Sequence, residues 1–127
     1  MINLSNAANA PDHNSAAQAK VVSRLYELTV IYQDRCARAD PAAAQEYKTE
    51  LQRFNSTYPK LQQLLTASPH YATAVSNYKN EVASESNDEK QASTSDECRH
   101  MSFLLRSMTD TPEGAQAVKE YVDILSK

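Results

Sequence analysis

Two cysteines, Cys36 and Cys98, are the residues of this chain with the most evident chemistry. Each falls on the apolar stripe of a predicted helix, Cys36 near the end of the first helix and Cys98 near the start of the fourth. If successive helices alternate in direction, both positions lie at the same end of the molecule. The sequence therefore predicts a disulfide between them. The alternative is a pair of reduced thiols, because free cysteine is often buried as a small apolar side chain.

A disulfide would also indicate the compartment in which the protein works. Disulfides persist in oxidising compartments and are rare in the cytosol. We therefore expect a periplasmic or secreted protein, with a reduced cytoplasmic protein as the alternative. The first residues, MINLSNAANAPDHNSAA, lack a basic region followed by an apolar run and are not an intact signal peptide. A start Met placed on a mature exported domain would give such a sequence, and so would an ordinary cytosolic protein.

The three histidines do not complete a catalytic or metal-binding motif. His100 follows Cys98 by two residues, about 200° around a helix, so the two side chains point apart. His70 follows Pro69 at a predicted helix start, and His13 lies in a polar N-terminal arm. The sequence contains no HExxH, CxxC or CxxCH motif, and its one glycine excludes Gly-rich phosphate loops. We expect no metal, no cofactor and no enzymatic activity.

An acidic segment, SESNDEKQASTSDE, spans residues 84–97. Five carboxylates against Lys90 give it a charge of −4, which leaves +1 for the rest of a chain with net charge −3. Such a segment is either a solvated linker or a docking surface for a cationic partner, because complementary charge raises association rates. The candidate partner-binding residues are Glu85, Asp88, Glu89, Asp96 and Glu97.

The remaining composition restricts the class of partner. Lys and Arg number 13 against 16 Asp and Glu, and they form no basic cluster, which argues against nucleic-acid binding. No apolar run approaches the ~18–20 residues of a membrane span, so we expect no membrane insertion. The predicted partner is another protein, bound by a monomer or a homodimer of this chain.

Helices are the elements expected to position all of these residues. A length of 127 residues favours one domain, and a single glycine disfavours folds built on tight β-turns. The first helix is predicted over residues 15–39, with one apolar stripe that includes Cys36. A helix apolar on two sides is usually packed between others, although the second side can instead be a dimer surface. That second stripe consists of Ala19, Tyr26, Val30 and Ala37.

Prolines mark three predicted helix starts. Pro41, Pro69 and Pro112 each follow Asp, Ser or Thr, which are good N-cap residues, and proline is tolerated at the first helical position. The helix that begins at Pro41 keeps its apolar spacing across Pro59, so we expect a kink there and not a break. The fourth helix is predicted to start with Ser95 as its cap, or to begin earlier, near Asn87 or Asp88.

The expected fold is all-α, a single-domain up-and-down bundle of four to five helices over residues 15–127 after a disordered arm over residues 1–14. A cross-linked bundle with one charged segment is similar in architecture to small exported helical proteins of bacteria, among them immunity proteins. The resemblance implies a non-catalytic exported protein that binds another protein, such as an inhibitor or immunity factor. The alternatives are a cytosolic adaptor or dimerisation module that uses the second stripe, and a small ligand carrier or enzyme with an interhelical pocket near Pro59.

Overall fold

Helices account for every regular element of the computed structural model, which describes residues 2–84 and 94–127 and gives only the backbone for residues 2–13. No strand occurs in these ranges, so the all-α prediction is confirmed for them. The helices form six rods where we expected four or five.

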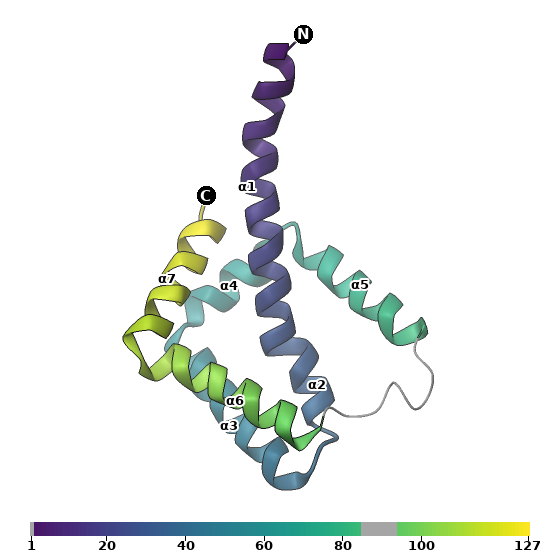
Figure 1. The fold of residues 1–127 in the computed structure, drawn as a ribbon, viewed down its shortest axis with the longest axis vertical. Coiled ribbons are helices and arrows are strands. Elements are labelled where there is room, and N and C mark those ends of the chain that lie inside the picture. The colour runs from purple at the N-terminus through teal and green to yellow at the C-terminus, as the bar shows by residue number, and fades with distance from the viewer. Residues whose placement is uncertain (1, 85–93) are drawn as a thin grey trace.

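The first rod is the axis of the molecule (Figure 1). It consists of α1 (Ile2–Tyr26), the π-helical segment η1 (Glu27–Ile31) and α2 (Tyr32–Cys36). The helix begins earlier than the expected Ser15, although the four asparagines and Pro11 before that residue are poor helix formers. α1 projects beyond the other rods at its N-terminal end. The division of the chain into an arm and a bundle at residue 14 stays a prediction.

The other rods follow the proline pattern in part. Asp40 caps α3 by accepting the N–H of Ala43 at 3.1 Å, and Thr111 caps α7 by accepting the N–H of Gly114 at 3.0 Å. Both starts are as predicted. The helix expected at Pro69 begins later, because the Ser68 hydroxyl accepts the N–H of His70 in a turn. These rods are α3 (Pro41–Thr57), α4 (Pro59–Ala67), α5 (Tyr71–Ser84), α6 (Ser95–Asp110) and α7 (Pro112–Leu125).

A break, and not the expected kink, separates α3 from α4. Tyr58 has φ −126° and ψ 60°, outside the helical region. The ring of Pro59 crowds the preceding residue out of the α conformation, so the helix ends at Thr57 and a new one begins. Apolar residues on both sides of the break nevertheless belong to one core. They include Leu51, Phe54, Leu61 and Leu65.

The first rod is packed between other helices, as its two apolar stripes predict. Leu25 on the main stripe is fully buried in the core. Tyr26 on the second stripe is only 5% exposed, because α5 lies against it. Its ring meets those of Tyr71 and Tyr78 edge to face, with centroids 5.6 and 6.3 Å apart. The centre of the second stripe is thus covered within the molecule, which weighs against its use as a dimer surface.

α3 and α6 run side by side in the same direction (Figure 1). Ion pairs join the two helices, and the residue numbers of the partners increase together along both. In the sequence, α4 and α5 connect the end of α3 to the start of α6. The pairs are Asp40–Arg99, Glu50–Arg106 and Arg53–Asp110. The parallel direction places the start of α6 beside the end of the first rod.

The chain's single glycine lies where α7 meets α6. A Cβ on Gly114 would stand 2.1 Å from the carbonyl oxygen of Ser107 and 2.6 Å from the Cα of Met108. The φ of Gly114 is not positive, so close backbone approach is the reason for glycine here. Any larger residue would push α7 away from α6.

Candidate functional site

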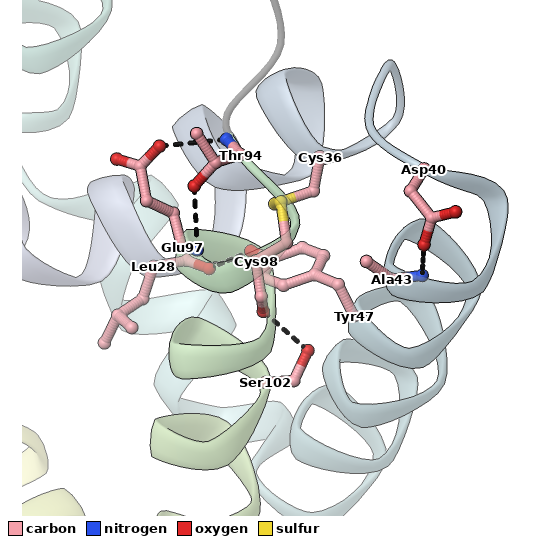
Figure 2. Close-up of a disulfide and its surroundings, with 9 residues drawn as sticks. All are labelled: Leu28, Cys36, Asp40, Ala43, Tyr47, Thr94, Glu97, Cys98 and Ser102. Carbon is pink, nitrogen blue, oxygen red and sulfur yellow. Dashed lines mark hydrogen bonds between the residues drawn. A yellow bond between two sulfur atoms is a disulfide. The ribbon is translucent and has the colours of Figure 1, made fainter.

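Cys36 and Cys98 form the predicted disulfide (Figure 2). Their Cα atoms lie 5.8 Å apart, and both side chains are completely buried. The bond joins the last residue of α2 to the first turn of α6 across 62 positions of sequence. Because Cys98 is bonded, it cannot act as a nucleophile with the exposed His100.

A capping box fixes the start of α6 next to the disulfide (Figure 2). The Thr94 hydroxyl accepts the N–H of Glu97 at 3.1 Å, and the Glu97 carboxylate accepts the N–H of Thr94 at 2.9 Å. The cap is therefore Thr94 and not the predicted Ser95. Of the five candidate partner-binding residues, Glu97 has a local structural role and Asp96 is exposed beside it. The other three, Glu85, Asp88 and Glu89, lie outside the described residues.

Tyr47 joins α3 to the π-helical segment η1. In η1 the N–H of Tyr32 donates to the carbonyl of Glu27, five residues back, instead of to that of Leu28. The Tyr47 hydroxyl donates to this Leu28 carbonyl and replaces the missing partner. Tyr47 is 2% exposed, and its burial raises the pKa of the hydroxyl well above the ordinary value.

We expect Tyr47→Phe to lower the free energy of unfolding by about 1–3 kcal/mol, because a buried carbonyl loses its donor. The folded-state pKa lies above the unfolded one, so the stabilisation is full below about pH 10 and is lost as the pH rises above it. Urea unfolding measured at about pH 8 and at about pH 11 gives the drop in the free energy of unfolding between these two pH values. This drop should be smaller for Tyr47→Phe than for the wild type. Tyr121→Phe, at a half-buried tyrosine, is the matched control. Equal effects of the two substitutions would refute this role of Tyr47.

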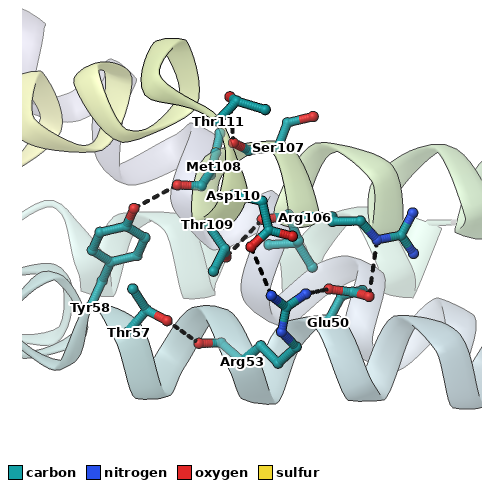
Figure 3. Close-up of polar contacts among 11 residues, drawn as sticks. Glu50, Arg53, Thr57, Tyr58, Arg106, Ser107, Met108, Thr109, Asp110 and Thr111 are labelled. Atoms are coloured by element: carbon teal, nitrogen blue, oxygen red, sulfur yellow. Dashed lines mark hydrogen bonds and ion pairs between the residues drawn. The ribbon is translucent and has the colours of Figure 1, made fainter.

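Glu50 is a carboxylate buried between α3 and α6 (Figure 3). Its side chain is 9% exposed and accepts hydrogen bonds from Arg53 at 2.7 Å and from Arg106 at 3.1 Å. Arg53 also donates to Asp110 at 2.7 Å. Both oxygens of this buried carboxylate are engaged by guanidinium groups, so we assign this network to packing of α3 on α6.

A groove of about 450 Å³ lies between the first rod and α5. The buried Val22 and Tyr26 line its inner side. Exposed polar side chains from both helices line it as well, namely Lys20, Ser23, Thr73 and Asn77. A concave site with an apolar base and several hydrogen-bonding groups is the usual form of a binding site.

Polar contacts at both ends align α5 with the first rod. Ser15, early in the rod, is hydrogen-bonded to His70 at 3.1 Å. Arg35, late in the rod, pairs with Glu81 at 3.8 Å. The two helices therefore run in the same direction along the groove.

α5 is held on the rod by few interior contacts, since none of its side chains is buried. Tyr78 supplies a second attachment beside its ring contact with Tyr26. Its hydroxyl donates to Asp34 at 3.0 Å, and the Arg35 guanidinium lies 5.9 Å from its ring centroid. Burial and the hydrogen bond to Asp34 raise the pKa of Tyr78. The α5 wall of the groove depends on these aromatic and polar contacts.

Neither a cluster of metal ligands nor a membrane-spanning helix occurs in the described ranges. Within residues 14–84 and 94–127, no three His, Cys, Asp or Glu side chains gather closely enough to hold a metal ion. Among the helices of the described part of the chain, none has the length and apolarity that crossing a bilayer requires.

Comparison with protein-family models, curated proteins and solved structures finds no match for this chain. The candidate site is therefore defined by the chain's own residues. It consists of the groove between the first rod and α5, in a molecule in which the Cys36–Cys98 disulfide joins α2 to α6.

Proposed function

We propose that this chain is an exported, non-catalytic helical protein that binds another protein, as inhibitors and immunity factors do. The observation that carries the proposal is the fully buried disulfide between Cys36 and Cys98. Because such bonds persist in oxidising compartments, it supports a periplasmic or secreted location over a cytoplasmic one.

Rigidity supports a binding role. The disulfide joins α2 to α6, Tyr47 joins α3 to η1, and the Glu50 network joins α3 to α6. A protein that is already ordered loses less conformational entropy on association than a flexible one. These links make the molecule a preorganised surface for its partner.

Electrostatic steering by the acidic segment completes the proposal. Asp96 and Glu97 lie in the first turn of α6, where a carboxylate is favoured by the helix dipole. Because Glu97 also belongs to the capping box, we assign attraction of a cationic partner chiefly to Glu85, Asp88 and Glu89. Removing those three charges tests steering without disturbing the start of α6.

The test is the association rate with the partner, captured from the envelope fraction of the source organism and then purified. Combined Glu85→Gln, Asp88→Asn and Glu89→Gln should slow association about tenfold at low salt and flatten its salt dependence. The control variant, Glu113→Gln with Glu120→Gln and Asp123→Asn, removes as many exposed charges from α7 and should change the rate less than about twofold. Equal rates for the two variants would refute steering by the acidic segment. Recovery of the native protein from the cytoplasm with reduced thiols would refute export.

A further inference from the structure

We infer that the groove between the first rod and α5 binds a short zwitterionic peptide of about three residues in extended form. Its carboxylate would pair with Lys20, toward the His70 end of the groove, and its ammonium group would pair with Glu27, toward the Glu81 end. This ligand is distinct from the protein partner proposed above.

Opposite charges along the groove, Lys20 against Glu27 and Glu81, are the first support. Lys20, His70, Glu27 and Glu81 all line it. The Ser15 contact of His70 and the Arg35 contact of Glu81 fix which ends of the helices coincide. Because the two helices run in the same direction, Lys20 lies toward the His70 end of the groove and Glu27 lies toward the Glu81 end.

The spacing of these charges sets the length of the ligand. Lys20 and Glu27 are seven positions apart in the sequence, which is about 10 Å along a helix. An extended chain spans about 3.3–3.6 Å per residue. A peptide of about three residues therefore places its two terminal charges beside Lys20 and Glu27.

Groups between the charged ends match the backbone and side chains of such a peptide. Ser23 and Thr73 provide hydroxyls and Asn77 provides an amide, which can both donate and accept. An extended peptide presents N–H and C=O groups that need such partners. Tyr26 and Val22 offer an apolar surface for its central side chain.

The carboxylates at the acidic end remain accessible to a ligand. Glu27 pairs with Arg24 at 3.4 Å, and both side chains are more than 40% exposed. Glu81 is 60% exposed in its 3.8 Å pair with Arg35. The Arg24–Glu27 pair is exposed on both sides and contributes little, and Glu81 stays exposed although Arg35 is only 20% exposed, so an ammonium group can join either carboxylate. Glu27 also opens the π-helical segment η1, and such segments occur frequently at functional sites.

The test is a titration of the ¹⁵N-labelled, oxidised full-length protein with trialanine, followed by NMR. We expect saturable shifts at the amides of Ser23, Thr73 and Asn77. N-acetyl-trialanine amide, which has the same length and no charge, should bind at least about tenfold more weakly. Shifts elsewhere, no saturable shifts, or equal binding of the two peptides would overturn the inference.

Single charge changes then assign each end of the peptide. In Lys20→Met, trialanine and trialanine amide should bind alike, because the partner of the carboxylate is gone. In Glu27→Gln, trialanine and N-acetyl-trialanine should bind alike, because the partner of the ammonium group is gone. Lys119→Met and Glu120→Gln, both exposed on α7, should keep the wild-type preferences. A wild-type preference in Lys20→Met and Glu27→Gln would contradict the proposed orientation.

Discussion

Replacement of both cysteines, Cys36→Ala with Cys98→Ala, should lower the free energy of unfolding by about 4 kcal/mol. The bond closes a loop of 62 residues, and the chain-entropy model assigns about that stabilisation to a loop of this length. Since domains are typically stable by only ~5–15 kcal/mol, the expected loss is a large share of the total. Urea unfolding of oxidised protein, reduced protein and the double variant measures it.

The reduced wild-type protein is the control for packing in this experiment. It keeps both sulfur atoms in the core and loses only the covalent link, so it should retain whatever stability the buried side chains contribute. Reduced protein should therefore lie between the oxidised protein and the double variant, much nearer to the latter. Equal stability of the oxidised and reduced forms would show that the link between α2 and α6 is dispensable.

Gly114→Ala should destabilise the protein by about 3 kcal/mol. At an exposed helical position this substitution stabilises by roughly 0.5–1 kcal/mol, because alanine is the better helix former. Here the added methyl group would meet the backbone of Ser107 and Met108 at 2.1–2.6 Å, and α7 would have to move. A decrease in the free energy of unfolding on Gly114→Ala, where an exposed site would show an increase, therefore indicates close packing of α7 on α6.

Gln116→Ala, at an exposed position of α7, is the matched control for helix propensity. It should change the free energy of unfolding by less than about 0.5 kcal/mol. A Gly114→Ala variant as stable as the wild type would mean that α6 and α7 do not approach as closely as described.

Local chemistry made several elements predictable from the sequence. Asp40 and Thr111 cap their helices as expected, because a side-chain oxygen before a proline favours a helix start, although Ser68 before Pro69 forms a turn instead. The disulfide was predictable because Cys36 and Cys98 both lie on inward stripes at the same end of the bundle. The Thr94 cap was also present in the sequence, as the Thr-x-x-Glu pattern with Glu97, although Ser95 was predicted.

Features that depend on competing local forces were predicted less well. The apolar spacing on both sides of Pro59 favours one helix, whereas the ring of Pro59 excludes Tyr58 from helical geometry. The steric effect of the Pro59 ring prevails and the helix breaks. The core remains continuous because the apolar face of α4 also points inward. Glu50 lies between Tyr47 and Phe54 at helical spacing on the buried face of α3, and this phase was the signal that a carboxylate is buried there.

The groove could not be predicted from the sequence, because it depends on how α5 lies on the first rod. Tyr26, Tyr71 and Tyr78 set that contact, and no spacing rule indicates that three tyrosines from two helices meet. The π-helical segment η1 likewise has no sequence signature. It becomes evident only from its hydrogen bonds and from the Tyr47 hydroxyl that satisfies its released carbonyl.

The redox state of Cys36 and Cys98 in the native protein tests the central claim most directly. Intact mass should be measured on protein isolated from its source, alkylated under denaturing conditions first without and then with reductant. We predict no alkylation before reduction and two alkylated cysteines after it. Two alkylated cysteines before reduction would contradict the cross-link, and with it the exported location and the binding function proposed for this chain.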